Sequence, residues 1–357
     1  MSEHFHALTV AEIVPETADA NSIRFDVPDE LAGAFHFRAG QHVTLRTTID
    51  GEEVRRNYSL CVAPDDGELK VTVKRIAGGT FSNWVAENLK PGDLLDVMPP
   101  HGSFTVPFGA GQVKRYFAFA GGSGITPILS LIRTALATEP DSEFTLFYGN
   151  RDSSSVIFLE ALAGLKDRFM GRFGLYHFLS DEAGDVALFN GVLNRATCDA
   201  ALNDLVDDVS GIDEWFICGP GPMMDAAEAA LLDRGVEARR VHIERFTAGR
   251  PSEAVAATLA QLQSVATGFR LSVTLDGRTR EVPFNGANIL DSARAAGLPA
   301  PYACKAGVCA TCRARVTAGE VTMAARYGLT DEEIAAGFVL TCQSVPRGSG
   351  VAVNYDG

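Results

Sequence analysis

Alternating hydrophobic and polar positions dominate the first hundred residues. Short alternating runs at residues 41–45, 70–74 and 94–98 read as half-buried strands, and glycine and proline turns separate them. Several short strands at this spacing are typical of an antiparallel β-barrel. We therefore predict a barrel domain over residues 1–108.

A different pattern begins near residue 115. Apolar strands at residues 116–120, 144–148 and 214–218 alternate with segments of helical periodicity such as residues 128–137. Strand–helix alternation of this kind predicts a parallel sheet flanked by helices. The predicted α/β domain covers residues 109–246.

The composition changes again at residues 247–267, which are rich in small residues and are predicted to form a linker with helical turns at 254–263. Strand patterns then return, and a helix is expected at residues 289–296. Residues 268–357 are therefore predicted to form a third, α+β domain. Because the linker composition is typical of a flexible tether, we expect this domain to move relative to the other two.

Composition agrees with an ordinary globular protein of several domains. The chain has 357 residues, of which 46% are hydrophobic and 21% charged. No apolar run approaches the roughly 20 residues of a membrane span. The first residues lack a signal-peptide pattern, so we expect a cytoplasmic protein with reduced thiols.

Charge narrows the choice of partners. The net charge of −14 argues against nucleic acid and anionic membranes. Residues 268–357 nevertheless carry nine Lys/Arg against eight Asp/Glu. Lys305, Arg313 and Arg315 are either solvated surface charges or a basic rim for an acidic electron acceptor.

Four cysteines near the C-terminus carry the clearest chemistry. Cys304, Cys309 and Cys312 have the spacing C-x4-C-x2-C, and Cys342 follows later. This is the ligand spacing of a plant-type [2Fe–2S] cluster. Zinc usually needs two C-x2-C pairs, and disulfides need an oxidising compartment, so both alternatives are disfavoured. The other three cysteines (Cys61, Cys198, Cys218) are not expected to be ligands.

A second motif lies at the end of a predicted strand. Residues 56–59 resemble the R-x-Y-S motif of the ferredoxin–NADP reductase superfamily. The resemblance implies that Tyr58 stacks on a flavin, Arg56 pairs with its pyrophosphate and Ser59 reaches flavin N5. Paired glycines then open a helix at residues 81–89 whose N–H groups suit phosphate. The predicted flavin-binding residues are Arg56, Tyr58, Ser59, Leu60, Val73, Lys74, Gly79, Phe81 and Ser82.

Two further turns predict a nicotinamide site. Residues 121–127 join a strand to a helix, and their glycines can expose N–H groups to a pyrophosphate. In the same superfamily, a turn like that at residues 218–220 lies beside the nicotinamide, and a segment like 244–246 lies near the flavin. The predicted nucleotide-binding residues are Gly121, Gly122, Gly124, Ile125, Thr126, Pro127, Arg151, Ser153, Gly219, Pro220 and Met223. The candidate catalytic residues are Ser59, Cys218 and Glu244, with Cys218 expected as a wall rather than a nucleophile.

The strand at residues 144–148 bears on the choice of nucleotide. It runs into Arg151 and three serines, which suit the 2′-phosphate of NADPH. Asp152 could instead serve the ribose hydroxyls of NADH. We expect NADPH.

The order of these motifs resembles a ferredoxin–NADP reductase module fused to a plant-type [2Fe–2S] domain of β-grasp fold. Segments such as 40–42, 148–151, 242–246 and 336–342 more closely resemble the reductase components of phenylacetyl-CoA 1,2-epoxidase complexes. The resemblance implies FAD (or FMN), a [2Fe–2S] cluster and NADPH as cofactors. It implies a di-iron oxygenase of aerobic phenylacetate degradation as the partner. The alternative is the reductase component of a ring- or steroid-hydroxylating oxygenase.

Two other classes of function stay open on the sequence. One is an electron carrier without a flavin, against which the intact flavin and nucleotide motifs argue. The other is a regulatory iron–sulfur sensor, for which no DNA-binding motif gives support.

Overall fold

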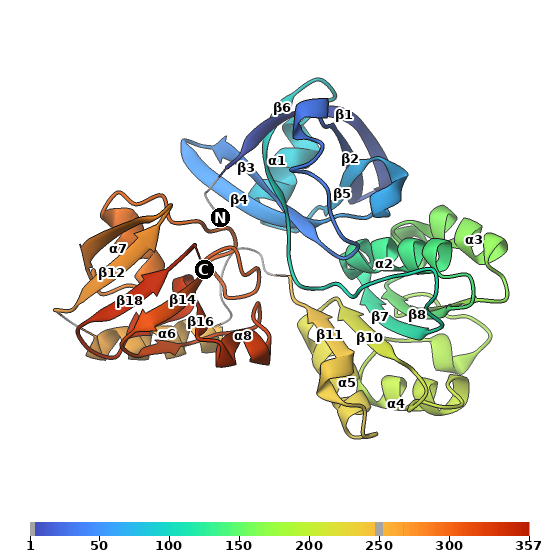
Figure 1. Cartoon of the computed structure of the whole chain (residues 1–357). Coiled ribbons are helices and arrows are strands. Elements are labelled where there is room, and N and C mark those ends of the chain that lie inside the picture. Colours follow the sequence, from blue (N-terminus) through green and yellow to red (C-terminus); the bar gives the residue numbers. More distant parts are fainter. Residues whose placement is uncertain (1–3, 247–252, 267, 357) are drawn as a thin grey trace.

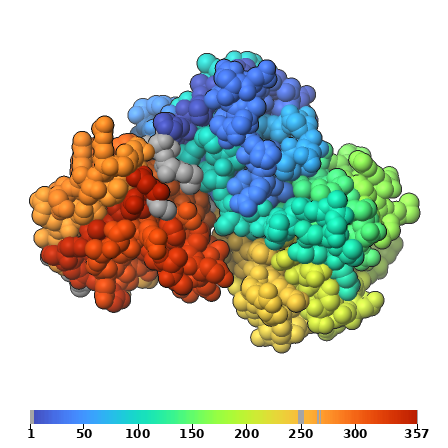
Figure 2. Space-filling model, viewed as in Figure 1, coloured from blue at the N-terminus to red at the C-terminus, as the bar shows by residue number. Residues whose placement is uncertain are grey.

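Three lobes follow one another along the chain in the computed structural model, which describes residues 4–246, 253–266 and 268–356 (Figure 1). We call them the barrel domain (residues 4–108), the parallel-sheet domain (109–246) and the C-terminal domain (253–356). The C-terminal domain, orange to red, packs along one side of the other two (Figure 2). No helix in the described ranges is long and apolar enough to cross a membrane.

The barrel domain is a six-stranded antiparallel sheet in the order β4-β3-β6-β1-β2-β5. A bridge between Leu60 and Val71 joins its two ends, which confirms the predicted barrel. Inward-facing aliphatic side chains fill its core, and helix α1 (Thr80–Asn88) adds Phe81 and Val85 to it. The strands are β1 (His6–Thr17), β2 (Ala20–Asp26), β3 (His42–Ile49), β4 (Glu52–Ser59), β5 (Leu69–Lys74) and β6 (Leu94–His101).

The parallel-sheet domain has five parallel strands in the order β11-β10-β7-β8-β9, which confirms the predicted parallel sheet. Side chains of β7 alternate between its faces: Tyr116 and Ala118 pack with α2 and α3, whereas Phe117 and Phe119 pack with α4 and α5. The strands are β7 (Arg115–Gly121), β8 (Glu143–Asn150), β9 (Phe173–Leu179), β10 (Glu214–Cys218) and β11 (Val241–Glu244). The helices are α2 (Ile125–Thr138), α3 (Leu159–Arg168), α4 (Arg195–Leu205) and α5 (Gly221–Leu232).

The C-terminal domain has a five-stranded mixed sheet in the order β13-β12-β18-β14-β16 and a two-stranded sheet, β15-β17. Strands β12 and β18 are parallel and the other pairs antiparallel, which confirms the predicted α+β fold. Helix α7 (Ile289–Ala295) buries Ile289, Leu290 and Ala293 in the core. The remaining elements are β12 (Arg270–Leu275), β13 (Arg278–Pro283), β14 (Arg313–Ala318), β15 (Val321–Met323), α8 (Asp331–Ala335), β16 (Phe338–Leu340), β17 (Ser344–Pro346) and β18 (Val351–Asn354).

A helix occupies most of the predicted linker. Helix α6 (Glu253–Val265) extends the helical turns expected at 254–263, and its Leu259 and Leu262 pack against the core of the C-terminal domain. The helix therefore belongs to that domain as packed structure. The rest of the predicted linker, residues 247–252 and Thr267, lies outside the described residues.

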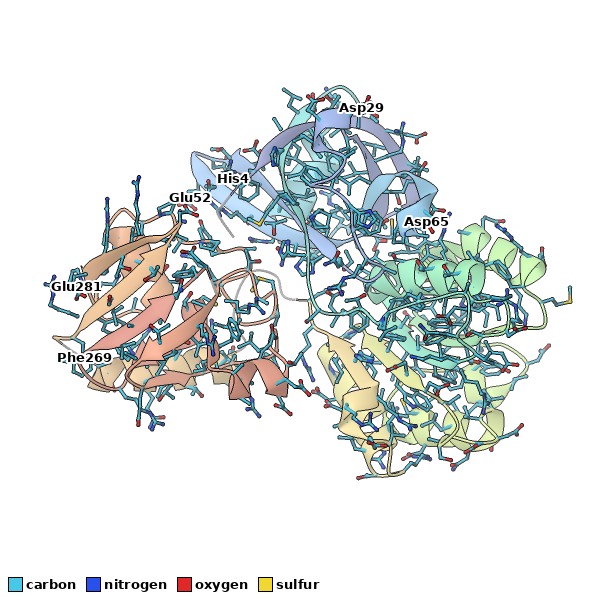
Figure 3. The ribbon with its side chains drawn as sticks, viewed as in Figure 1. His4, Asp29, Glu52, Asp65, Phe269 and Glu281 are labelled. Atoms are coloured by element: carbon cyan, nitrogen blue, oxygen red, sulfur yellow. The ribbon has the colours of Figure 1, made fainter. Side chains whose placement is uncertain are left out.

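The barrel contacts a different neighbour on each side. Figure 3 places Glu52, at the start of β4, on the side toward the C-terminal domain, and Asp65 on the side toward the parallel-sheet domain. On the second side, Arg133 of α2 forms an ion pair with Asp66 at 3.0 Å. The barrel thus contacts both other domains, and the C-terminal domain also meets the parallel-sheet domain directly, where Arg245 lies 5.3 Å from the centre of the Tyr327 ring.

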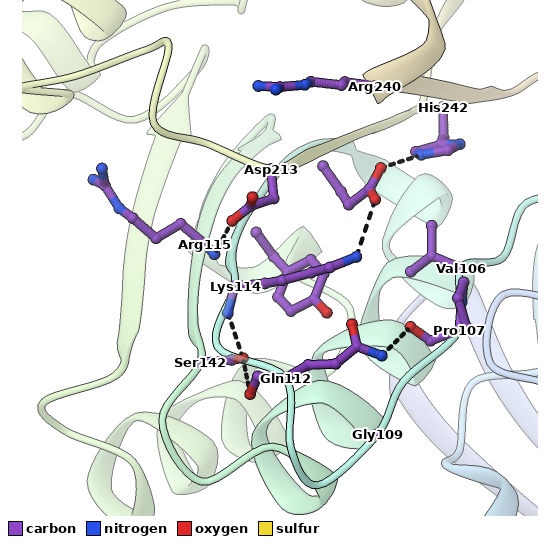
Figure 4. A network of polar contacts seen from close by, with 12 residues as sticks. Val106, Pro107, Gly109, Gln112, Lys114, Arg115, Ser142, Asp213, Arg240 and His242 are labelled. Atoms are coloured by element: carbon purple, nitrogen blue, oxygen red, sulfur yellow. Dashed lines mark hydrogen bonds and ion pairs between the residues drawn. The ribbon is translucent and has the colours of Figure 1, made fainter.

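The segment that leads from the barrel into the parallel-sheet domain is bound by a network of polar contacts (Figure 4). The network lies at the amino ends of the parallel strands. Glu214 accepts from Lys114 Nζ at 3.2 Å and contacts His242 Nε2 at 2.8 Å. The Lys114 backbone donates to Ser142 Oγ at 2.8 Å. The glycine turns of the predicted nucleotide site lie at the opposite edge of the sheet, where the parallel strands end.

Candidate functional site

Four cysteine side chains meet at one end of the C-terminal domain. Cys304, Cys309 and Cys312 lie in the loop between α7 and β14, and Cys342 follows β16. All four are at most 7% exposed. The backbone N–H of Ala306 donates to Cys304 Sγ at 3.3 Å. The structure therefore brings together the four cysteines that the spacing selects and gives one sulfur a backbone donor.

The four thiols form two pairs. Hydrogen bonding to Cys309, followed by burial, raises the pKa of Cys304, and hydrogen bonding to Cys312 raises that of Cys342 in the same way. Two pairs of thiols fit two irons. Cluster binding there must release protons, because thiolates are the ligands.

The other three cysteines lie elsewhere. Cys61 is in the barrel, Cys198 on α4 and Cys218 at the end of β10, and all are buried and free. Burial raises the pKa of Cys61 and of Cys198 to about 12. These thiols behave as small apolar side chains.

The predicted flavin residues surround a cavity of about 180 Å³ between the ends of β4 and β5 and the start of α1. Tyr58 contributes its ring, which lies 5.7 Å from that of Phe81 between centroids. Leu60 and Val73 point into the barrel core instead, so only their backbone can face a ligand. Of the predicted residues, Arg56, Tyr58, Ser59, Lys74, Gly79, Phe81 and Ser82 line the cavity; Thr72, Ile76, Thr126 and Phe246 are among the residues that join them.

The start of α1 is built to receive an anion. No side chain caps this helix, whose N-cap is Gly79. Ser82 Oγ instead accepts from the backbone N–H of Ile76 at 3.1 Å, which shapes the turn. Uncapped N–H groups at a helix start bind phosphate oxygens. The Tyr58 ring and the start of α1 are therefore the groups that would contact the ring and the phosphates of a flavin nucleotide.

The predicted nucleotide turns pack directly on one another. A Cβ atom at Gly124 would lie 2.0 Å from the carbonyl oxygen of Cys218, and one at Gly121 would lie 2.5 Å from Pro220. Tyr148, which the sequence analysis did not select, donates to the carbonyl of Gly122 at 3.0 Å and fastens the turn. The glycines are needed because the two turns meet backbone to backbone.

A cavity of about 410 Å³ opens beside these turns at the carboxyl edge of the sheet. Gly121, Gly122, Arg151, Pro220 and Met223 line it among the predicted residues. Ile125, Thr126 and Pro127 are buried in the first turn of α2, which begins three residues earlier than predicted. Ser153 does not line the cavity; its N–H donates to Glu182 at 2.7 Å.

Asp152 is occupied by its own turn. Its carboxylate accepts from Ser154 Oγ at 2.7 Å and from the backbone N–H of Ser155 at 2.9 Å. The Ser154 hydroxyl is the main cause of the lowered pKa of Asp152. Arg151 pairs with Asp19 of the barrel at 3.7 Å, but its side chain is 62% exposed and lies at the cavity.

The flavin cavity, the cysteines and β11 meet at one point. A small cavity of about 40 Å³ is lined by Arg56, Ser59 and Glu244 on one side and by Cys304 and Cys309 on the other. Ser59 Oγ donates to Glu244 Oε2 at 3.1 Å. The predicted flavin and cluster residues, from domains far apart in sequence, therefore face each other.

Comparisons with known proteins agree with this geometry. Three family models match: an oxidoreductase FAD-binding domain at residues 7–106, an oxidoreductase NAD-binding domain at 119–229 and a 2Fe-2S iron-sulfur cluster binding domain at 273–347. The chain is 45% identical, over 99% of its length and 98% of the relative's, to one of the subunits of the 1,2-phenylacetyl-CoA epoxidase of Escherichia coli (strain K12). The chain belongs to this family of flavin iron–sulfur reductases. FAD, a nicotinamide nucleotide and a [2Fe–2S] cluster are its cofactors.

Other relatives serve other oxygenases. The 3-ketosteroid-9-alpha-monooxygenase ferredoxin reductase component of Rhodococcus rhodochrous is 38% identical over 95% of this chain and 93% of the relative. A type IV self-sufficient cytochrome P450 monooxygenase gives a TM-score of 0.71 at 25% identity over 98% of this chain, which spans 41% of that protein. Phthalate dioxygenase reductase shares the fold, with a TM-score of 0.59 at 23% identity over 98% of both chains.

In this reductase, an arginine–tyrosine contact joins the barrel to the C-terminal domain. Arg55 is 3% exposed, donates to the carbonyl of Tyr302 at 3.1 Å and lies 4.0 Å from the centre of the Tyr302 ring. The Tyr302 hydroxyl donates to Glu53 at 3.1 Å. We call Arg55, Glu53 and Tyr302 the docking contact.

The charges near the cysteine loop are paired within the C-terminal domain. Lys305 pairs with Asp291 at 2.7 Å, Arg313 with Glu333, and Arg315 donates to the carbonyl of Ala336 at 3.1 Å. A basic rim for an acceptor stays a prediction.

Proposed function

We propose that this reductase takes electrons from NADPH and delivers them, through FAD and its [2Fe–2S] cluster, to a di-iron oxygenase. The partner that we favour is the phenylacetyl-CoA epoxidase of aerobic phenylacetate degradation, because the 45% identity to its Escherichia coli relative extends over essentially both chains. The cytoplasm, where thiols stay reduced, suits the seven free cysteines. The net charge of −14 argues against nucleic acid and anionic membranes as partners.

One observation carries the electron-transfer function: Ser59 and Glu244 line the same small cavity as Cys304 and Cys309. When bound, the flavin supplies the exchange between two-electron and one-electron chemistry, and the cluster carries single electrons. The chain itself holds these groups close, stacks Tyr58 on the flavin ring and places phosphates at the start of α1.

Ser59, Cys218 and Glu244 have distinct proposed roles. The Ser59 hydroxyl, held by Glu244, presents its oxygen to the flavin ring. Cys218 is fully buried, and burial, with a smaller contribution from Glu244, holds its pKa well above the ordinary value. It therefore stays a neutral thiol and forms a wall beside the nicotinamide, because a nucleophile would have to be a thiolate.

NADPH is proposed over NADH on the contacts at the end of β8. Arg151 lies at the cavity and can bind phosphate with two N–H groups, whereas Asp152 is engaged by Ser154 and Ser155. The carboxylate that an NADH site would offer to the ribose is therefore turned to its own loop.

The partner is tested by reconstitution. The purified reductase is mixed with the oxygenase component of phenylacetyl-CoA epoxidase, and NADPH oxidation is followed with phenylacetyl-CoA present. We expect oxidation coupled to product formation. Coupling only with a steroid- or ring-hydroxylating oxygenase would favour the alternative that the 38% identity to the ketosteroid component supports.

A further inference from the structure

A hydrogen-bonded path crosses from the barrel to a cysteine ligand. His101, at the end of β6, has its Nε2 3.0 Å from Thr311 Oγ1 of the C-terminal domain. The Thr311 hydroxyl donates to Cys309 Sγ at 3.2 Å. Thr311 is thus placed between a histidine of one domain and a proposed cluster ligand of the other.

The protons on this path can be assigned. His101 Nδ1 lies 3.0 Å from the carbonyl oxygen of Pro99, which can only accept, so Nδ1 carries a proton. Burial, aided by His42, lowers the pKa of His101 to about 3, so the ring is neutral and Nε2 is an acceptor.

The Thr44 hydroxyl does not donate to His101 Nε2. Its hydroxyl donates to Asn57 Oδ1 at 2.9 Å and lies 3.5 Å from His101 Nε2. Asn57 in turn has its amide nitrogen 3.2 Å from His42 Nε2, which fixes the amide orientation. Within the described residues, the hydroxyl that remains to donate to His101 is that of Thr311.

A threonine hydroxyl has one proton to give. In the docked arrangement, His101 Nε2 competes with the Cys309 sulfur for this proton and so weakens the hydrogen bond to the sulfur. If the C-terminal domain separates from the barrel, His101 stays with the barrel. Thr311 then has Cys309 as the acceptor for its proton. Hydrogen bonds to the sulfurs set the potential of a [2Fe–2S] cluster, because they stabilise the more negative reduced state.

We propose that His101 is a positioning residue that makes the cluster potential depend on docking, lower while His101 competes for the Thr311 proton and higher once Thr311 donates to Cys309 alone. This inference rests on the proposed electron-transfer function. Each docking event moves one electron from the flavin to the cluster, and undocking then makes its return to the flavin less favourable. The Thr311 proton changes partner and does not leave the protein.

The test measures the cluster potential in the purified holoenzyme by mediator titration, followed by electron paramagnetic resonance, without any oxygenase. His101→Phe keeps an aromatic ring but removes the acceptor. We expect its potential to rise by the equivalent of a tenfold change in the one-electron equilibrium, about 59 mV. His101→Leu serves as a second replacement if the first does not fold.

Thr311 provides the matched control. In a Thr311→Val background, the His101 replacement should no longer raise the potential, whereas Thr311→Ser should preserve the rise. An unchanged or lowered potential in both His101 variants overturns the proposal, as does an equal rise in the Thr311→Val background. Failure to reduce an oxygenase would contradict the proposed function but leave this measurement intact.

Discussion

Asp152 and Arg151 are neighbours with opposite charges, and only their side-chain contacts separate their roles. The sequence presents both at the end of the strand after the glycine turn. The structure engages Asp152 in a local turn and places Arg151 at the cavity, where it pairs with Asp19 of the barrel. The positions of Arg151 and Asp152 in the chain therefore do not decide between NADPH and NADH. The deciding contact is the hydrogen bond that Asp152 accepts from Ser154.

Arg151→Ala should raise the KM for NADPH about tenfold or more and leave that for NADH nearly unchanged. A lost charge-assisted hydrogen bond costs about 1.5–3 kcal/mol. Steady-state kinetics with both nucleotides check this. Arg195→Ala, on α4 and paired with Asp199, is the control and should alter neither constant. Equal weakening of both nucleotides would show that Arg151 is not the phosphate ligand.

Replacement of Cys342 by Ala should abolish the cluster while NADPH still reduces the flavin, because three thiolates leave one iron with a single protein ligand. The visible spectrum and stopped-flow reduction report the two cofactors separately. Cys198→Ala, a buried thiol on α4, should keep the full cluster signal. A Cys342→Ala protein with an intact cluster spectrum would remove Cys342 from the ligand set.

At the scale of elements, the two glycine turns of the parallel-sheet domain pack closer together than a Cβ atom on either glycine would allow. Gly124→Ala should lower stability by about 1–3 kcal/mol and weaken NADPH binding, because the new Cβ would meet the Cys218 carbonyl at 2.0 Å. Calorimetry and KM check the two effects. Gly164→Ala, on α3 with nothing near its Cβ, should stabilise the helix slightly. Indistinguishable behaviour of the two variants would contradict the close approach.

The Glu214 network predicts a pH-dependent stability. Burial raises the pKa of Glu214, but the His242 hydrogen bond and Lys114 outweigh it, so the pKa is lowered from 4.5. A carboxylate with a lowered folded pKa stabilises above its unfolded pKa, and this contribution is lost as the pH falls through the folded value. Glu214→Gln should therefore lower the melting temperature of this domain at pH 7, by about 2–4 °C for each kcal/mol lost. The difference from wild type should shrink below pH 4.5.

Calorimetry at several pH values measures this difference. Glu68→Gln, on an exposed turn of the barrel, is the control and should show little effect. A constant difference at all pH values would mean that Glu214 acts through packing rather than charge.

A site could be predicted from the sequence where its residues lie close together in the chain. The cysteines, the R-x-Y-S segment and the glycine turns are local patterns, so their chemistry could be predicted before the structure. His101 and Thr311 are separated by 210 positions, and no local pattern links them. Helix α6 was expected only as helical turns, because its alanine-rich composition also suits a linker and its docking through Leu259 and Leu262 is a tertiary contact.

At the scale of the whole molecule, the docking contact should control electron flow between domains. Tyr302→Ala removes the ring beside Arg55 and the hydroxyl bonded to Glu53, and a desolvated cation–π contact is worth about 2 kcal/mol. We expect cluster reduction to slow by tenfold or more in stopped-flow experiments, while flavin reduction by NADPH keeps its rate. Tyr302→Phe keeps the ring and should show a smaller effect. Unchanged cluster reduction in both variants would exclude the contact as a determinant of docking.

Helix α6 limits the reach of the cluster. This helix packs on the C-terminal domain, so it is not part of the connection between the domains. The connection consists of the seven peptide units between Phe246 of the parallel-sheet domain and Glu253. A fully extended chain covers at most about 3.6 Å per residue, so the first residue of α6 stays within about 25 Å of Phe246. The C-terminal domain therefore stays beside the other two domains and cannot leave them to reach a distant acceptor. An oxygenase must bring its own metal site to the surface of the reductase, and the shape of that encounter sets which oxygenases can be served.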